Sequence, residues 1–267
     1  MRIISLNAWG GVLHSPLVRY LGEAQADVLC LQEVTRTPQA RSDWLAYRDH
    51  GLELPQRANL FDEIRAVLPD HDAAFFPAAR GTLFEGERLV ASEFGLATFT
   101  HTSLSVIGEA MDFVHGAFSP KGWGEHPRAR NAHCLKLFDH ASGWPVTIAQ
   151  MHGLRDMAGK GDTPARRAQA EALVRLIERL WHPGERLVVC GDFNILPQSE
   201  TFAILARLGL FDLVTARGFT DTRTSHYAKA GRFADYMLAT PQVEILGFDV
   251  VAEPEVSDHR ALLLDFR

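Results

Sequence analysis

Acidic, amide and imidazole residues recur at the ends of apolar, strand-like segments of this chain. These segments are expected to be buried, and a carboxylate beside buried residues costs several kcal/mol unless it is paired or binds a metal ion. A turn or a helix cap would explain one such residue. The pattern appears at six places and involves Asn7, Glu33, His152, Asp192, Asn194, Asp235, Asp258 and His259. We therefore expect these side chains to meet at one site.

The residue types in this set favour phosphate-ester hydrolysis. Carboxylate and amide oxygens without cysteine partners suit Mg²⁺ or Mn²⁺ better than structural zinc, and either one or two ions fit the sequence. Two imidazoles supply acid–base capacity near neutral pH, and a neighbouring carboxylate can fix the tautomer of an imidazole. A metal ion, a positioned water and an acid for the leaving group are what this reaction needs.

Other residues are weaker candidates for contacts with the substrate: Lys121, Arg130, Lys160 and Tyr236. Lysine and arginine bind phosphate, but a solvated loop charge, or core packing for the tyrosine, is the alternative. Glu93 is a candidate partner for His152, with a solvent-facing charge as its alternative. Arg166 and Gln169 are expected to brace the loop that carries Lys160.

The composition is that of an ordinary globular protein, with 46% hydrophobic and 22% charged residues among 267. A net charge of −6 argues against non-specific coating of nucleic acid. Three distant cysteines, Cys30, Cys134 and Cys190, indicate buried thiols and no disulfide framework. The chain shows no signal-peptide pattern and no membrane-spanning run, so a cytoplasmic location without stable membrane insertion is expected.

Strand-like and helix-like segments alternate along the chain, which predicts a layered α/β fold in a single domain over residues 1–267. The predicted strands are Arg2–Leu6, Asp27–Leu31, Gly95–Phe99, Ser103–Ile107, Ala132–Phe138, Val146–Gln150, Leu187–Cys190, Phe233–Leu238, Ile245–Val251 and Ala261–Phe266. The predicted helices are Ser15–Ala24, Asn59–Val67, Thr163–Leu180 and Ser199–Leu208. Val34–Arg57 and Phe118–Arg130 are poorly periodic and are predicted to be long loops.

Four motifs, in this order, resemble those of the endonuclease/exonuclease/phosphatase superfamily: Leu31-Gln32-Glu33, Gly191-Asp192-Phe193-Asn194, Asp235-Tyr236 and Ser257-Asp258-His259. The superfamily includes exonuclease III-like repair enzymes, deoxyribonuclease I, neutral sphingomyelinases and inositol polyphosphate 5-phosphatases. The resemblance extends over Arg2–Arg267. It implies a four-layer αββα sandwich, in which two packed mixed β-sheets are flanked by helices and the active site lies at one edge of the sheets.

The resemblance also implies metal-binding and water-activating roles. Glu33 is similar to the main metal ligand, assisted by Asn7 and Asp258. Asp192 corresponds to the group that orients or deprotonates the attacking water, and Asn194 to the group that holds a phosphate oxygen.

Two histidines complete the implied site. His259, paired with Asp235, is similar to a general base or a stabiliser of developing charge. His152 corresponds to the second histidine of the deoxyribonuclease I and sphingomyelinase branches. The chain departs from the family where Gln150 stands two residues before this histidine, in place of a frequent Asn. It also lacks the Trp-Cys-Asp-Arg segment of the phosphoinositide branch.

The resemblance leaves three functions open. The first is a nuclease or other phosphodiesterase acting on DNA or RNA, which the small unadorned domain slightly favours. The second is a phosphatase or phosphodiesterase for a small-molecule or lipid substrate, supported by the acidic charge and by His152. The third is a non-catalytic binding module, which the presence of all eight site residues disfavours. A phosphate-ester substrate and a monomeric chain are expected.

Overall fold

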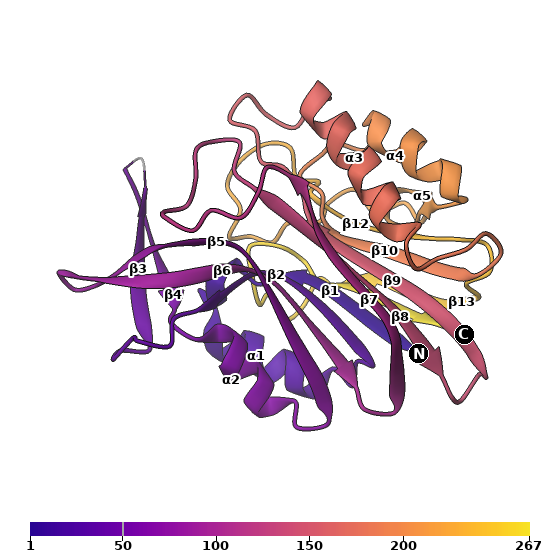
Figure 1. Ribbon diagram of the computed structural model, residues 1–267, viewed down its shortest axis with the longest axis horizontal. Coiled ribbons are helices and arrows are strands. Elements are labelled where there is room, and N and C mark those ends of the chain that lie inside the picture. Colours follow the sequence, from indigo (N-terminus) through magenta and orange to yellow (C-terminus); the bar gives the residue numbers. More distant parts are fainter. Residues whose placement is uncertain (50) are drawn as a thin grey trace.

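The computed structural model describes residues 1–49 and 51–267. Two mixed β-sheets pack against each other, and helices cover their outer faces, as Figure 1 shows. This is the αββα sandwich that the family resemblance implied.

Within the described residues, the first sheet contains eight strands and the second contains six. The first has the order β13 (Ile245–Val250), β14 (Leu262–Phe266), β1 (Arg2–Asn7), β2 (Val28–Arg36), β6 (Arg88–His101), β5 (His71–Glu85), β3 (Trp44–Asp49) and β4 (Leu52–Arg57). The second has the order β11 (Phe211–Asp212), β12 (Asp235–Ala239), β10 (Arg186–Asp192), β9 (Trp144–His152), β8 (Arg130–Asp139) and β7 (Leu104–His115). The pairs β1–β2 and β9–β10 are parallel, so the carboxyl ends of each pair lie at one edge of its sheet.

Alternation along the central strands sends apolar side chains to both faces of the first sheet. Ile3 and Cys30 belong to the core shared with the second sheet, whereas Ile4 and Leu29 pack toward the helices. Burial on both faces explains why these strands are continuous apolar runs in the sequence.

Two groups of helices form the outer layers. The first sheet is covered by α1 (His14–Glu23) and α2 (Leu60–Val67), and the second by α3 (Pro164–Ile177), α4 (Glu200–Leu205) and α5 (Leu213–Ala216). Single 3₁₀ turns, η1 (Trp9–Gly11) and η2 (Ala206–Leu208), complete the helical elements of the described residues. At the start of α3, the Thr163 hydroxyl accepts a hydrogen bond from the Arg166 backbone N–H, and Pro164 occupies the first turn, as its cap signal predicted.

The segment Val34–Arg57 is not the long loop that the sequence predicted. β2 continues into it, and β3 and β4 form an antiparallel hairpin, while the prediction for His50 lies outside the described residues. The charges that suggested a loop pair across the hairpin, as Arg48 Nε does with Glu53 at 2.9 Å. Pro55 is tolerated because β4 is an edge strand.

A second correction concerns β5, which the sequence analysis missed. This strand pairs with β6 in a long hairpin that extends well beyond the predicted Gly95–Phe99. Its alanines, Pro77 and Gly81 are poor strand formers, so its conformation depends on pairing with β6. The register shifts between Pro77 and Ala79, where a Cβ on the facing Gly95 would lie 2.0 Å from the Phe76 carbonyl oxygen.

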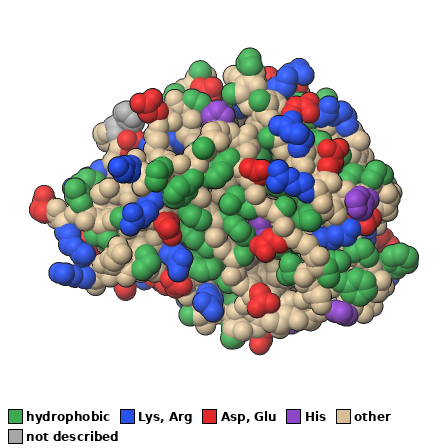
Figure 2. Space-filling model, in the orientation of Figure 1, with side chains coloured by type: hydrophobic (Ala, Val, Ile, Leu, Met, Phe, Trp, Pro, Cys, Tyr) green, Lys and Arg blue, Asp and Glu red, His purple; other side chains and the backbone are tan. Residues whose placement is uncertain are grey.

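The loop over residues 118–129 agrees with its prediction, and Arg130 begins β8. Isolated bridges Ala79–Ser119 and Arg80–Gly122 hold this loop against β5. The three cysteines are buried and free. Among the described residues, no helix has both the length and the apolar character needed to cross a membrane. Figure 2 shows acidic, basic and apolar side chains interspersed over one face of the molecule.

Candidate active site

The carboxyl ends of the central strands bring together the predicted site residues of both sheets. Asn7 ends β1 beside Gln32 of β2, and Asp192 ends β10 in register with both His152 of β9 and Asp235 of β12. The segment before β14 adds Asp258 and His259 from the first sheet. The two sheets therefore meet at one polar edge.

Asp192 lies at the centre of this cluster and is 2% exposed. One carboxylate oxygen accepts a hydrogen bond from Asn7 Nδ2 at 3.0 Å, and the other accepts from the Asn194 backbone N–H at 3.0 Å. The Nε2 atoms of His152 and His259 lie 3.8 and 3.7 Å from its Oδ2. Asp192 thus joins groups from opposite sheets.

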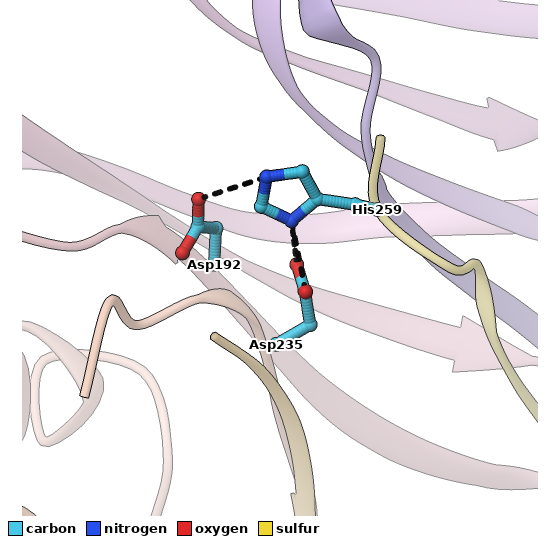
Figure 3. A group of neighbouring side chains, drawn as sticks. All are labelled: Asp192, Asp235 and His259. Atoms are coloured by element: carbon cyan, nitrogen blue, oxygen red, sulfur yellow. Dashed lines mark hydrogen bonds and ion pairs between the residues drawn. The ribbon is translucent and has the colours of Figure 1, made fainter. Parts of the chain in front are cut away.

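His259 and Asp235 form a buried pair that Figure 3 shows beside Asp192. The Nδ1 atom of His259 lies 2.9 and 2.8 Å from the two oxygens of Asp235, while its Nε2 faces Asp192. This contact holds the proton on Nδ1, because the carboxylate accepts it, and leaves Nε2 as the basic nitrogen.

Burial controls the charge of this pair. It raises the pKa of Asp235 to about 7, against the effect of the nearby Arg223. Burial, together with the smaller effect of Arg223, lowers the pKa of His259 to about 4. Burial also lowers the pKa of His152, assisted by Arg130. Both imidazoles are therefore uncharged at neutral pH, as proton acceptors must be.

Two further carboxylates offer oxygens suited to a hard cation. Burial raises the pKa of Glu33, whereas a hydrogen bond with Asn7 opposes that rise. Burial also raises the pKa of Asp258, where His259 and Arg223 oppose the rise and Glu33 adds to it. The Oδ1 atom of Asp258 is buried and accepts no hydrogen bond among the described residues. An orphaned buried oxygen beside a second carboxylate fits a divalent metal ion.

Donor atoms of Asp192, Asp235 and His259 also lie within 4.8 Å of one another. Both oxygens of Asp235 are already engaged by His259 Nδ1, so this trio is better described as a proton-handling group. The oxygens that remain open to a cation belong to Glu33 and Asp258.

The backbone at the site adopts conformations that few residues tolerate. Glu33 has φ 57° where the β2–β6 register shifts, and Asn194 has φ 55°. Gly191 has φ 134°, and a Cβ there would lie 2.1 Å from the Met151 carbonyl oxygen. Such left-handed positions cost free energy and cluster at functional sites.

Two of the candidate substrate contacts lie near the cluster. Arg130 is 7% exposed, and its Nε donates to the Gly153 carbonyl at 3.0 Å. Burial lowers its pKa to about 10, while Glu33 and Asp192 oppose that shift. Lys160 Nζ donates to the carbonyls of Gly231, at 2.6 Å, and Phe233.

The braces expected around Lys160 are present. Arg166 donates to the carbonyls of Gly159, at 2.8 Å, and Gly161, and Gln169 Oε1 accepts from the Leu154 backbone N–H at 2.7 Å. This anchoring connects the loop after His152 to α3.

The other three candidates lie elsewhere. Tyr236 is fully buried, packs against Phe202 and donates to the Ile195 carbonyl, so it has no access to a substrate. Lys121 lies in the exposed part of its loop, and no hydrogen bond or ion pair among the described residues joins it to the cluster. Among the described residues, no hydrogen bond or ion pair joins Glu93 to His152 either. The ring of the neighbouring Phe94 packs near His152 instead, with 6.4 Å between the ring centroids.

Sequence reasoning missed Arg223, which reaches both Asp258 and His259. It also missed Thr222, whose hydroxyl accepts from the Ala234 and Asp235 backbone N–H groups and so supports the start of β12. Neither residue belongs to a motif or ends a strand-like run. An isolated β-bridge between Arg223 and His259 brings the segment into the site.

The chain also resembles known proteins. Residues 4–259 match the model of the endonuclease/exonuclease/phosphatase family. No curated protein matches the chain by sequence.

Solved structures share the fold at low identity, and each comparison covers 100% of this chain. An endonuclease/exonuclease/phosphatase from Bacteroides vulgatus has 19% identity, 98% coverage of its own chain and a TM-score of 0.69. The human Nocturnin catalytic domain has 20% identity, 93% coverage and a TM-score of 0.67. A mannosyl-6-phosphatase from Bacteroides thetaiotaomicron has 14% identity, 99% coverage and a TM-score of 0.68.

Members of the matched family hydrolyse phosphate esters and generally use divalent metal ions. The match extends over nearly the whole chain. On this match, the protein belongs to the endonuclease/exonuclease/phosphatase family of phosphoric-ester hydrolases.

Proposed function

We propose that this chain is a divalent-metal-dependent hydrolase of phosphate esters. The observation that carries the proposal is the convergence on Asp192 of an amide from β1 and two uncharged imidazoles, one from each sheet. Glu33 and Asp258 lie beside this group and offer the oxygens that a cation needs. Basic nitrogens, a central carboxylate and a cation site together support hydrolysis of a charged ester.

Glu33, Asp258 and Asn7 would hold Mg²⁺ or Mn²⁺, one ion or two. The orphaned Oδ1 of Asp258 and the influence of Asn7 on the pKa of Glu33, which places the two side chains close together, support this assignment. When bound, the ion supplies positive charge that neutralises the phosphate oxygens.

The remaining residues would position and deprotonate the attacking water. Asp192 lies between the two imidazoles and orients the water through its carboxylate. Nε2 of His259 accepts a proton, and the resulting charge is stabilised by Asp235 through Nδ1. Asn194 would hold a phosphate oxygen, and His152 would stabilise charge on the ester as the leaving group departs. The leaving oxygen would take its proton from solvent water.

A pocket beside this site favours a small phosphorylated substrate. The β3–β4 hairpin and the loop over residues 118–129 meet where Arg128 donates to Asp49 at 2.6 Å and to the Tyr47 hydroxyl at 2.9 Å. Together with Met157, from the segment that follows His152, they line a half-open pocket of about 520 Å³. A pocket of this volume falls in the range of small-molecule sites, which supports a small phosphorylated substrate.

Aromatic contacts link this wall to the site. The rings of Tyr47 and Trp123, of Trp123 and Phe94, and of Phe94 and His152 lie 5.9, 6.1 and 6.4 Å apart. These packed rings connect the hairpin and the loop that line the pocket to His152. The alternative, a nuclease acting on DNA or RNA, is tested in the same screen as the small phosphate esters.

A metal-supplemented screen separates the substrate classes. We expect Mg²⁺ or Mn²⁺ to support hydrolysis of small phosphate esters, with a KM that changes little between low and moderate salt. Plasmid DNA, abasic oligonucleotide, RNA and sphingomyelin form the other arms. A nucleic-acid substrate would instead show affinity that falls steeply with salt. Activity that persists in excess chelator, or no activity on any phosphate ester, would contradict the proposed function.

A single catalytic domain over residues 1–267, a monomeric state and a cytoplasmic location are proposed on the sequence alone.

A further inference from the structure

Arg223 enters the site from a loop that no motif marks. Its backbone forms an isolated bridge with His259, and its carbonyl accepts from Arg232 at 2.9 Å and from Arg260 at 2.9 Å. Its own N–H donates to Asp221 at 2.7 Å. The backbone is thus fixed on several sides, and the side chain, 6% exposed, is directed into the cluster.

The guanidinium contacts two groups that the proposed reaction uses. The NH1 nitrogen of Arg223 donates to Asp258 Oδ2 at 3.0 Å and to His259 Nε2. The guanidinium carbon lies 4.2 Å from the centroid of the Tyr227 ring, which supports it by a cation–π contact. Its Nε is buried and has no acceptor among the described residues.

Lys160 lies against the same ring, with Nζ 5.7 Å from its centroid. Burial lowers the pKa of Lys160 to about 8, and Arg223 contributes to that shift, so the two cations are close. Tyr227 therefore holds two positive side chains beside the carboxylates of the site. This arrangement gives the site a cationic side formed by the protein itself.

A purely structural ion pair does not account for these contacts. The contact that decides is made by NH1 of Arg223, which donates to the nitrogen of His259 that must accept a proton in the proposed reaction. Because one lone pair cannot serve both purposes, Arg223 must change partner when substrate binds.

We propose that Arg223 is a substrate-binding residue whose guanidinium moves from His259 Nε2 to a non-bridging oxygen of the scissile phosphate. The planar fork of an arginine matches phosphate oxygens, and the exchange leaves Nε2 open to accept a proton. The inference rests on the proposed function, since it names a phosphate as the partner.

The proposal distinguishes phosphate binding from metal binding. The contact with Asp258 Oδ2 places Arg223 in competition with a cation for that carboxylate. Removing the guanidinium should therefore weaken phosphate binding while metal affinity stays equal or rises. Loss of a structural brace would weaken both.

Calorimetric titration of the metal-loaded protein with inorganic phosphate tests this inference. We expect Arg223→Met to weaken phosphate binding at least tenfold, and Arg223→Lys to recover part of the loss. Titration of the metal-free proteins with Mn²⁺ should show undiminished affinity in both variants. Arg217→Met, an exposed arginine after α5, is the matched control and should behave as the wild type.

Three results would overturn the role of Arg223: no phosphate binding by the wild type, unchanged phosphate affinity in Arg223→Met, or a parallel loss of phosphate and Mn²⁺ affinity in both variants. If Arg223→Met does not fold, Arg223→Lys keeps the test decisive, because a lysine that binds phosphate as tightly as the wild type would also exclude a need for the guanidinium. A wild type that binds phosphate yet hydrolyses no ester would contradict the proposed function alone.

Discussion

At the residue scale, Asp192 is the side chain on which the site converges. Its two oxygens accept from Asn7 and from the Asn194 backbone, and both imidazoles lie within 4 Å of it. All of these contacts are polar, so the role of Asp192 depends on the charge of its carboxylate more than on the volume of its side chain. Its replacement by an isosteric amide therefore separates chemistry from packing.

We predict that Asp192→Asn lowers kcat by about 10²- to 10⁴-fold, the range expected for loss of a group that handles a proton. The melting temperature should fall modestly, because asparagine keeps the shape and one acceptor while its NH2 group faces the second N–H donor. Steady-state kinetics with thermal denaturation measures both. A variant that retains full turnover would remove Asp192 from the mechanism.

Individual residues show which parts of the site could be predicted from the sequence. Asp192 and His259 could be predicted because polar residues beside apolar strands are costly and need a purpose. Arg223 could not, since it lies in a loop and meets His259 through a contact between segments 36 residues apart. Tyr236 lies beside the motif residue Asp235, but alternation along β12 turns it into the core.

At the scale of elements, a series of hydrogen bonds between buried side chains crosses the interface between the sheets. Gln32 Nε2 donates to Gln150 Oε1 at 2.9 Å, and Gln150 Nε2 donates to Thr98 Oγ1 at 2.8 Å. The Thr98 hydroxyl is then 2.8 Å from His133 Nδ1, and His133 Nε2 lies 3.1 Å from Glu109. Because Gln32 precedes Glu33, these hydrogen bonds tie the strand that carries Glu33 to the opposite sheet.

This series of hydrogen bonds requires a neutral His133, which accepts at Nδ1 and donates from Nε2. Burial lowers its pKa to about 3, even though Glu109 is near, because that carboxylate is half exposed and screened by water. An unfolded histidine titrates near 6.5. Between these values the unfolded chain binds a proton that the folded chain does not, so stability falls as the pH drops below about 6.5.

We predict that His133→Asn, which keeps an acceptor near the position of Nδ1, removes this contribution. On moving from pH 7.5 to pH 5, the wild type should lose about 2 kcal/mol more unfolding free energy than the variant. Urea denaturation at both pH values measures the difference. Equal losses in the two proteins would show that His133 does not titrate on unfolding. His152 and His259 are present in both proteins, so their contributions to the pH dependence cancel in the difference.

Elements differed in how well the sequence predicted them. The central strands and α3 have apolar runs and a cap, which are local signals. By contrast, β3, β4 and β5 carry Pro, Gly and charges and are strands because a neighbour pairs with them. That pairing joins positions distant in sequence, so local pattern does not reveal it.

At the scale of the whole molecule, the sandwich explains why residues from Asn7 to His259 form one site. Each sheet has a parallel central pair, and packing the two sheets together brings their polar ends into contact. The fold and the gathering of the site follow from strand patterns and the family resemblance. The pocket lined by Asp49, Arg128 and Met157 does not, because it depends on how a hairpin and a loop meet.

The central claim is that this edge of the sheets holds a divalent cation, and a calorimetric titration with Mg²⁺ and Mn²⁺ tests it most directly. We predict that the wild type binds at least one of these ions, that Glu33→Ala weakens binding at least tenfold, and that Glu93→Ala, which removes a carboxylate with no contact to the cluster, has no effect. A wild type that binds neither ion, or a Glu33→Ala variant with unchanged affinity, would contradict the account.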